Sequence, residues 1–551
     1  MKTKLLIVLA SVLIPISAVV LQANWNTAET PPEDNMITAC GIVFHDANGN
    51  RKYDDGEKPL PKIKVSNGKD IVLTDAQGKY QLSINNEDAI IFVIQPSGYQ
   101  VPMSKDMLPQ FYYVHRPKGA PKAKYKGVEP TGPLPDSVDF PLYPQKQPET
   151  FKALLFGDPQ PRDQKEIDYI SHDVLEELRN TDASMGITLG DIMFDNLSLF
   201  ESQCKAVALL GIPWYNVLGN HDINYDARNR ADANNTYERV FGPSYYSFDY
   251  GKVHFLVLDD IDWYEAKTKG KKSSWRYRGG FGKEQMQFIR NDLAMVPENQ
   301  LIVLLMHIPL YGVQDRQELY RLIEKRKFCI SISGHTHWQE HRFITKKDGW
   351  KGPEPHHHIV NVTVSGSWWS GAPDERGIPH TMMRDGAPNG YSIITFDGTD
   401  YTLDFKAAGR PANYQMNIQT PEEIPLDKLG ETDVYVNVFN GSEKSKVEMR
   451  LGNKGSWTTM TRKVAYDPHY VKLYKTEKAI LDKYRSPKKK DVKLPWRQLP
   501  GPTKSSHLWH AKLPVDAGEG VHVLQVRTTD MFGRTSEDSR VVRIVIKKEE
   551  K

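Results

Sequence analysis

Five apolar stretches in the middle of the chain each run into side chains that can bind a metal ion. The stretches read ALLFGD, MGITLGD, WYNVLGNHD, LIVLLMH and CISISGHTH, and they deliver Asp158, Asp191, Asn220, His221, Asp222, His307, His335 and His337. We expect each stretch to form a buried strand, and ligands bind at the carboxyl ends of such strands in α/β sheets. Carboxylate, amide and imidazole groups without a thiolate suit Mn²⁺, Zn²⁺ or Fe, so the spacing predicts a metal centre at one edge of a sheet.

The order of these motifs resembles that of a known superfamily. D-x-[HQ], G-D, G-N-H-[DE], H and G-H-x-H follow one another along the chain, as they do in the calcineurin-like metallophosphoesterases. The resemblance implies an α/β fold with a four-layer αββα core and a two-metal centre. It also implies an enzyme that hydrolyses a phosphomonoester or phosphodiester by attack of a metal-activated hydroxide.

The resemblance gives each motif residue a role. One metal ion would be held by Asp158, Gln160, Asp191 and His337, and the second by Asp191, Asn220, His307 and His335. Asp191 would then bridge the two ions, whose identity among Mn, Zn and Fe is left open. His221 would face the phosphate and protonate the leaving oxygen, and Asp222 would fix the orientation of His221.

Gln160 departs from the histidine found at this position in one layout of the superfamily. Its carbonyl oxygen could bind metal, or its amide could only hydrogen-bond a metal-bound water. The site is therefore either a working one with a variant ligand or the remains of one. Because the other expected ligands are all present, we favour an active metal-dependent phosphoric ester hydrolase.

Composition divides the chain into four segments. Residues 1–23 have the pattern of an export signal, because Lys2 and Lys4 precede an apolar run. Short alternating segments predict an N-terminal β-sandwich over residues 36–147, which includes a Pro- and Lys-rich connector. The catalytic domain is expected at 148–408 and a C-terminal β-sandwich at 409–551. This layout resembles secreted bacterial members of the superfamily with an SdrD B-like or prealbumin-like N-terminal domain.

The export signal predicts a secreted or periplasmic protein. The apolar run from Leu5 to Leu21 is close to the lower limit for a membrane span, so an uncleaved anchor is an alternative. Lipidation at Cys40 is a lesser one. A formal charge of +3 gives no reason to expect nucleic acid as a partner. The expected partner is a small-molecule or glycan-linked phosphate ester.

A calcium site is predicted in the N-terminal domain. The stretch HDANGNRKYDDGEKP places oxygen-bearing side chains at positions 1, 3, 5, 9 and 12 of a loop, namely Asp46, Asn48, Asn50, Asp54 and Glu57. This spacing suits Ca²⁺. The loop and the later TDAQGKY resemble the calcium loops of SdrD B-type repeat domains, although Arg51 stands where an EF-hand has Gly. The alternative is a polar turn that binds no metal.

Residues 365–391 are the candidate segment for substrate recognition. They follow the last ligand motif, and loops over strand ends carry specificity, so we expect Trp368, Trp369 and Arg384 to contact substrate. The alternative is that the tryptophan pair anchors the C-terminal domain. Two other functions stay open: a surface glycan or cell-wall binding protein with a vestigial metal site, and a pyrophosphate or nucleotide-sugar hydrolase using the same centre.

Overall fold

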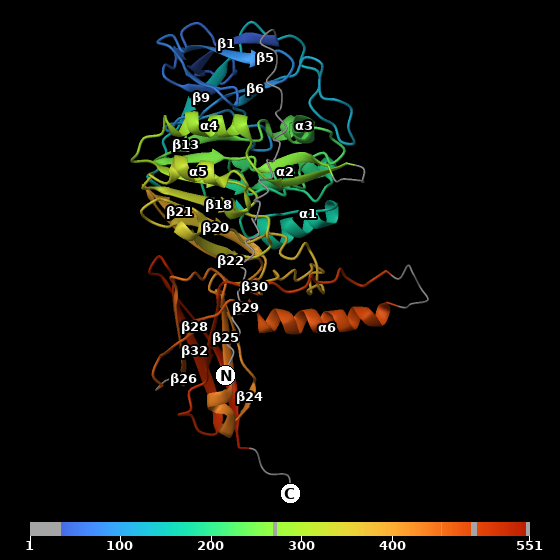
Figure 1. The fold of residues 1–551 in the computed structure, drawn as a ribbon, viewed down its shortest axis with the longest axis vertical. Coiled ribbons are helices and arrows are strands. Elements are labelled where there is room, and N and C mark those ends of the chain that lie inside the picture. Colours follow the sequence, from blue (N-terminus) through green and yellow to red (C-terminus); the bar gives the residue numbers. More distant parts are fainter. Residues whose placement is uncertain (1–34, 268–272, 453–454, 486–492, 547–551) are drawn as a thin grey trace, which may run out of the picture.

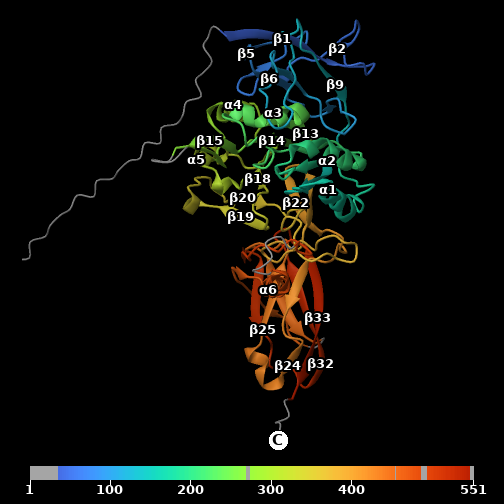
Figure 2. The ribbon, with the colours of Figure 1, turned by 90° about the vertical axis from the view of Figure 1, so that its right-hand side faces the viewer.

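Three domains lie one after another along the long axis of the molecule (Figures 1 and 2). The computed structural model describes residues 35–267, 273–452, 455–485 and 493–546. The predicted export signal lies outside these ranges. Within them, no helix is both long enough and apolar enough to cross a membrane.

The N-terminal domain consists of two small sheets. In β5 the burial alternates strictly, with Tyr80, Leu82 and Ile84 facing the core, as expected for a strand with one solvated face. One sheet contains β1 (Met36–His45), β2 (Lys58–Pro59), β5 (Lys79–Asn85), β7 (Tyr99–Gln100) and β9 (Phe140–Pro144). The other contains β3 (Lys64–Ser66), β4 (Ile71–Leu73), β6 (Ala89–Val93) and β8 (Tyr112–His115).

Two larger sheets form the middle of the central domain. The first has the order β12 (Trp214–Asn216), β11 (Met185–Thr188), β10 (Thr150–Phe156), β21 (Gly390–Asp397) and β22 (Asp400–Ala407). The second has the order β13 (Tyr246–Tyr250), β14 (Val253–Val257), β17 (Leu301–Leu305), β18 (Cys329–Ser333), β20 (His356–Val360) and β19 (Glu340–Ile344). Strands β10, β11 and β12 are parallel, as are β14, β17, β18 and β20, so their carboxyl ends lie at common edges.

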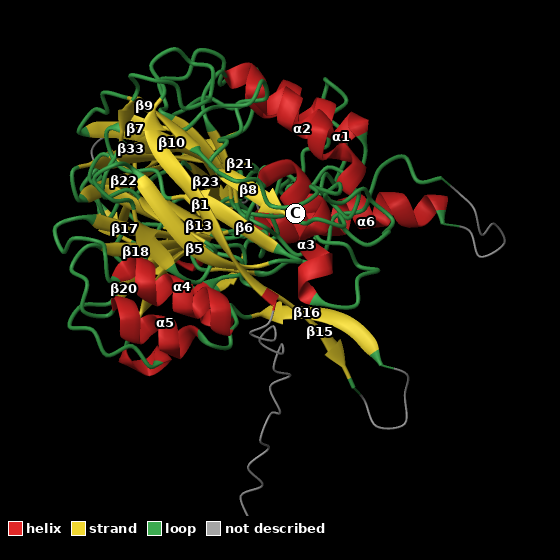
Figure 3. Ribbon diagram, turned by 90° about the horizontal axis from the view of Figure 1, so that it is seen from above, coloured by secondary structure: helices red, strands yellow, loops and turns green. Residues whose placement is uncertain are grey.

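Helices cover the outer faces of both sheets, and the inner faces pack on each other (Figure 3). In β10, Leu154 and Phe156 pack in the cluster of α1 and α2, whereas Ala153 and Leu155 belong to the cluster between the sheets. The predicted αββα core is therefore confirmed. Its helical segments are α1 (Gln164–Ile170), the π-helical η2 (Ser171–Leu175), η3 (Leu197–Leu199), α2 (Phe200–Val207), η4 (Ala208–Leu210), α3 (Arg230–Phe241), α4 (Lys283–Leu293), η5 (Leu310–Gly312), α5 (Arg316–Ile323) and η6 (Lys346–Asp348). A hairpin of β15 (Ile261–Ala266) and β16 (Ser274–Gly279) extends from this domain.

The C-terminal domain is a sandwich of two sheets with one helix beside it. One sheet contains β23 (Met416–Gln419), β25 (Asp433–Val438), β31 (Leu508–Lys512) and β28 (Thr461–Arg462). The other contains β24 (Glu423–Pro425), β33 (Thr535–Val545), β32 (Gly520–Thr529), β26 (Lys446–Leu451) and β27 (Thr458–Thr459). Three further elements are η7 (Leu426–Glu431) and the pair β29 (Ala465–Tyr466) and β30 (Lys504–Ser505).

Helix α6 (Pro468–Tyr484) was not expected from the sequence. Asp467 caps it by accepting the backbone N–H of Tyr470 at 2.7 Å, and Pro468 occupies the first turn, where its missing N–H costs nothing. The helix lies beside the sandwich, at the end nearest the central domain (Figure 1).

The N-terminal and central domains share one continuous core. The rings of Phe92 and Phe288 lie 5.7 Å apart across the junction, and those of Phe111 and Tyr246 lie 4.8 Å apart. The N–H of Asp249 also donates to the carbonyl of Gln95.

A buried charged group lies beside this junction. His254 contacts Asp249 Oδ1 and Asp292 Oδ2, both at 2.7 Å, and Lys64 of the N-terminal domain lies 3.6 Å from Asp292. Burial disfavours the imidazolium, but the two carboxylates outweigh it and raise the pKa of His254 to about 9.

This pairing predicts a pH-dependent contribution to stability. Because the pKa of His254 is raised above its ordinary value of 6.5, its stabilisation is complete below about pH 6.5 and is lost as the pH rises through about 9. The full effect is on the order of 3 kcal/mol. We expect the melting temperature of the wild type to fall more steeply over this range than that of His254→Gln. His172→Gln, at a side chain that is 62% exposed, should track the wild type. If the melting temperatures of the wild type and His254→Gln fell in parallel with pH, the raised pKa of His254 would be contradicted.

Candidate metal centre

The structure brings all seven predicted metal ligands into one connected set of contacts at the carboxyl ends of the strands. Asp158 follows β10, Asp191 follows β11, and Asn220 follows β12 in the first sheet. From the second sheet, His307 follows β17, and His335 and His337 follow β18. The site therefore lies where the edges of the two sheets meet.

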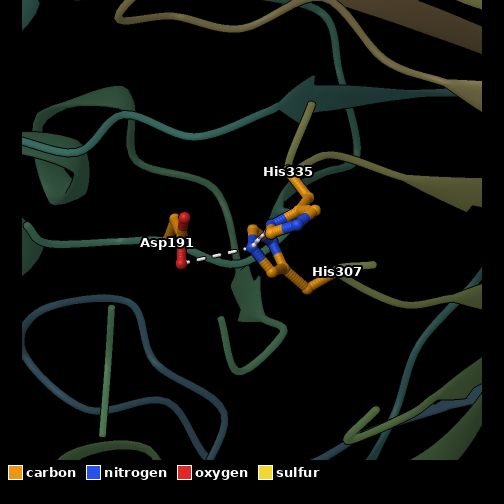
Figure 4. A group of neighbouring side chains, drawn as sticks. All are labelled: Asp191, His307 and His335. Atoms are coloured by element: carbon orange, nitrogen blue, oxygen red, sulfur yellow. Dashed lines mark hydrogen bonds and ion pairs between the residues drawn. The ribbon is translucent and has the colours of Figure 1, made fainter. Parts of the chain in front are cut away.

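Three ligand atoms approach the imidazole of His307, and Figure 4 shows two of the residues that supply them, Asp191 and His335. Its Nε2 lies 3.2 Å from Asp191 Oδ1, 3.2 Å from Asn220 Oδ1 and 3.1 Å from His335 Nδ1. Its Nδ1 lies 2.9 Å from the carbonyl of Leu189, which can only accept, so Nδ1 carries a proton and Nε2 is the nitrogen that faces the other ligands. A cation among these nitrogen and oxygen atoms would take the place of the proton that Asp191 otherwise favours on Nε2, so this group of ligands fits a metal ion.

Asp158 and His337 form the neighbouring part of the site. The Nδ1–H of His337 donates to the carbonyl of Gly366 at 2.5 Å, which leaves Nε2 bare and 3.6 Å from Asp158 Oδ1. Asp158 in turn accepts the backbone N–H of His335. Both side chains are fully buried.

Gln160 has one amide atom engaged and one without a partner. Its Nε2 donates to Asp191 Oδ2 at 2.5 Å, and the opposite amide orientation would set its oxygen against that carboxylate. Its Oε1 is buried and accepts no hydrogen bond from the described residues. A buried carbonyl oxygen that accepts no hydrogen bond has its lone pairs available for a cation, so Gln160 fits the direct-ligand alternative.

The backbone at the site is held in an unusual conformation. Five of the predicted ligands have positive φ: Asp158 (42°), Gln160 (42°), Asp191 (49°), His335 (74°) and His337 (56°). Non-glycine residues rarely adopt this region, which costs on the order of 1–3 kcal/mol each and persists where the surroundings impose it. The loops also approach closely. A Cβ on Gly219 would lie 1.9 Å from the backbone nitrogen of Asp191.

Burial and charge act against each other at this site. Burial raises the pKa of Asp158 to about 8 and lowers that of His335 to about 4 and that of His337 to about 3. Burial also opposes the charges of Asp191 and His307, but their mutual attraction keeps the pKa of Asp191 well below its usual range and raises that of His307 to about 10. A bound cation would favour the ionised carboxylates and unprotonated imidazoles together.

His221 lies beside the ligands and is oriented by a residue that the sequence did not indicate. Its Nδ1 contacts Asp195 Oδ1 at 2.7 Å, and its ring stacks on Phe194 with centroids 4.4 Å apart. Burial lowers the pKa of His221, but Asp191 and Asp195 outweigh it and the net shift is upward.

The expectation that Asp222 orients His221 is wrong. The carboxylate of Asp222 accepts the backbone N–H groups of Ile192, Met193 and Gly219 at 2.9–3.0 Å. Asp222 is fully buried whereas the side chain of His221 is 22% exposed, so Asp222 joins two loops within the core and His221 lies nearer the surface. The carboxylate that contacts His221 instead belongs to Asp195, four residues after Asp191 in the same loop, and the sequence analysis did not identify it.

The three predicted substrate residues lie in different surroundings. Trp369 is 2% exposed and donates its indole N–H to the carbonyl of Pro159, so it supports the first ligand loop from within the core. Trp368 stacks on His337, with centroids 3.9 Å apart. Arg384 donates to the carbonyl of Gly501 in the C-terminal domain, so it joins the domains and does not line the pocket described next.

A pocket of about 360 Å³ opens beside His221. It is lined by Arg162, Phe194, His221, Trp368, Ser370, Arg497, Gln498 and Pro500. Of these, the sequence indicated only His221 and Trp368. Arg162, two residues after Gln160, could have been found from its place in the same loop, whereas no local pattern links Arg497 to the site.

The predicted calcium loop forms a network of hydrogen bonds within itself. Asp46 accepts the backbone N–H groups of Gly49 and Arg51, and Asp54 accepts the side-chain amides of Asn48 and Asn50. Glu57 accepts two further backbone N–H groups. Among the described residues, the one group of three or more His, Cys, Asp or Glu placed to hold a metal is Asp191, His307 and His335. These contacts suit the polar-turn alternative, and calcium binding stays a prediction.

Three family models match the chain in succession. They are described as the N-terminal part of calcineurin-like phosphoesterase (residues 46–127), calcineurin-like phosphoesterase (151–339) and the C-terminal part of calcineurin-like phosphoesterase (358–535). No curated protein matches the chain. Among solved structures, a purple acid phosphatase from yellow lupin (Lupinus luteus) seeds is similar, at 15% identity and a TM-score of 0.34, covering 64% of this chain and 75% of that one. A TM-score this low supports no conclusion about function, so the functional assignment of this chain depends on the family models.

The close approach of the ligand loops predicts the effect of one methyl group. Gly219→Ala would place a Cβ 1.9 Å from the Asp191 nitrogen and 2.4 Å from its Oδ1, so the loops must separate. We expect this variant to lose most of its bound transition metal, measured by elemental analysis of purified protein. Gly518→Ala, whose Cβ would meet nothing within 4 Å, is the control. Wild-type metal content in Gly219→Ala would show that the close contact between the two loops is not needed for metal binding.

Proposed function

The chain belongs to the calcineurin-like phosphoesterase family and is a metal-dependent phosphoester hydrolase, and from this premise we propose that it cleaves a phosphomonoester or phosphodiester at a centre of two metal ions. The observation that carries the two-ion proposal is the convergence of imidazole nitrogens, carboxylate oxygens and the partnerless Oε1 of Gln160 in one buried place.

The ligands divide into two overlapping sets. Asp158, Gln160, Asp191 and His337 would hold one ion, and Asp191, Asn220, His307 and His335 the other. Asp191 can serve both, because its Oδ1 faces His307 and its Oδ2 faces Gln160. When bound, the ions supply the Lewis acidity that activates water near neutral pH and offsets the charge of the phosphate. The donor set suits Mn²⁺, Zn²⁺ or Fe.

His221 would act on the substrate directly. Asp195 accepts its Nδ1–H and thereby directs Nε2 away from Asp195, and the upward shift of its pKa favours the protonated ring. From the edge of the pocket, such a ring can donate a hydrogen bond to a phosphate oxygen and then give its proton to the leaving oxygen. Phe194 covers one face of the ring and limits its rotation.

We also propose that the enzyme acts outside the cytoplasm, in the periplasm or secreted. The support is the export pattern of residues 1–23. The proposed substrate is a small-molecule or glycan-linked phosphate ester, and any membrane association would come from the N-terminal segment or from lipidation.

The direct test combines metal analysis with two chromogenic esters. The protein is stripped with a chelator, and Mn²⁺, Zn²⁺ or Mg²⁺ is then restored before hydrolysis of p-nitrophenyl phosphate and bis-p-nitrophenyl phosphate is measured. We expect about two transition-metal ions per chain and hydrolysis that depends on them, with the better ester separating a monoesterase from a diesterase. Stoichiometric metal without turnover of either ester would overturn the proposal.

Substitution of His221 separates catalysis from metal binding. His221→Ala is expected to keep the wild-type metal content and to lose turnover by on the order of 10²- to 10⁴-fold, because the general acid is removed while the ligands stay in place. His172→Ala, on an exposed helical surface, is the matched control. A rate for His221→Ala equal to that of the control would remove His221 from the mechanism.

A further inference from the structure

The pocket beside His221 is assembled from two domains. Arg162, Phe194, Trp368 and Ser370 come from the catalytic domain, and Arg497, Gln498 and Pro500 come from the C-terminal domain. It lies between the proposed general acid and Trp368, the ring that stacks on the metal ligand His337. A group held here would therefore be attached to the scissile phosphate on the side of the leaving oxygen. The volume of about 360 Å³ is within the range of small-ligand sites.

The lining of this pocket is cationic. Its residues include two arginines and no carboxylate. Glu166, behind them, is the acid that both contact: it lies 2.9 Å from Arg497 Nη1 and 3.5 Å from Arg162 Nη1. Because one carboxylate faces two guanidinium groups, the three groups together carry a net positive charge. An anionic ligand would balance this charge.

Both guanidinium groups donate a hydrogen bond to the same backbone carbonyl and keep other N–H groups available for a ligand. Nη1 of Arg162 donates to the carbonyl of Trp368 at 3.0 Å, and Nη1 of Arg497 donates to the same carbonyl at 3.1 Å. Among the described residues, the remaining N–H groups of both guanidinium groups have no hydrogen-bond partner. Guanidinium groups fixed in this way can present parallel N–H donors to phosphate oxygens.

Both arginines are held in position by their surroundings. Arg162 lies over the ring of Phe194 at 4.0 Å, and that ring stacks on His221. The carbonyl of Arg497 accepts the N–H of Gly371 at 2.8 Å.

The segment that follows Arg497 is fixed as well. The hydroxyl of Tyr470 donates to the carbonyl of Pro500, and Arg384 exchanges hydrogen bonds with Gly501 and Thr503. The arginine pair is thus part of a built surface with little freedom to reorganise when a ligand binds.

We propose that Arg162 and Arg497 bind a second phosphate group on the leaving-group side, so that the enzyme prefers substrates whose leaving group is itself phosphorylated, such as nucleoside diphosphates. This rests on the proposed function. The water oxygen bonds to the terminal phosphorus, the bond from that phosphorus to the bridging oxygen breaks, and the bridging oxygen leaves with the inner phosphate. One proton of the water goes to solvent and His221 supplies the proton of the leaving oxygen, so no oxidant or reductant is needed.

The test compares AMP with ADP, because the leaving groups of the two differ by one phosphate. Release of phosphate is measured in the metal-loaded wild type, with AMP and adenosine separated by chromatography. We expect kcat/KM for ADP to exceed that for AMP at least tenfold, and this ratio to fall at least tenfold in Arg497→Gln. Arg179→Gln, at an exposed position outside the pocket, should keep the wild-type ratio. Arg497→Lys should give an intermediate ratio, because lysine keeps the positive charge but lacks the paired N–H donors of a guanidinium group.

The outcomes separate the two proposals. Metal content and melting temperature establish that each variant is folded. The change in the ratio between the wild type and Arg497→Gln is the decisive readout, because a phosphate is a better leaving group than a ribose hydroxyl whether or not a protein group binds it. Hydrolysis of p-nitrophenyl phosphate with equal values for AMP and ADP, or a folded Arg497→Gln with an unchanged ratio, would overturn the arginine site and leave the phosphoesterase intact. Hydrolysis of either chromogenic ester with no hydrolysis of AMP or ADP would likewise overturn only the arginine site. Absence of hydrolysis of AMP, ADP and both chromogenic esters by the metal-loaded wild type would instead overturn the proposed function, and with it this inference.

Discussion

One buried carboxylate holds the catalytic edge of the first sheet together. Asp222 accepts N–H groups from the loops after β11 and β12, and these loops carry Asp191, Asn220 and His221. The loops touch so closely that a glycine is required between them. Since a buried carboxylate without donors would be costly, the three hydrogen bonds and the loop geometry support each other. The positive φ of Asp191 lies within this arrangement, which holds the ends of two strands together at the site.

The sequence predicted those features that depend on local pattern. Alternating or continuously apolar runs such as LIVLLMH identify buried strands, and residues at the ends of parallel strands must lie near one another, so the ligands could be found without the structure. The αββα core was predicted correctly from these runs and from the family resemblance. The sequence also raised the question about Gln160, but only the hydrogen bond from its Nε2 to Asp191 indicates which amide atom is available.

The missed features depend on direction or on distance along the chain. The direction of neighbouring side chains in a loop is set by φ and ψ, which explains why Asp195 and not Asp222 contacts His221. Arg497 reaches the site through the docking of a whole domain, for which no periodicity exists. Helix α6 did carry a start signal in Asp467 and Pro468, but the surrounding strands favoured an all-β interpretation. Arg384 joins the central domain to Gly501, because loop residues after a catalytic motif can equally serve the domain boundary, and its contact with substrate stays a prediction.

The carbonyl of Trp368 accepts hydrogen bonds from both Arg162 and Arg497, so the C-terminal domain contributes to the proposed selection among substrates. The carboxylate of Glu477 in α6 contacts Nε2 of His380 and accepts the N–H of Ala372, so the C-terminal domain is attached to the loop that follows this carbonyl. The ligands that surround the metal site come from the central domain alone. Partial opening of the sandwich by heat or denaturant would therefore erode selectivity before it erodes turnover, and a partly unfolded enzyme would be a less discriminating one.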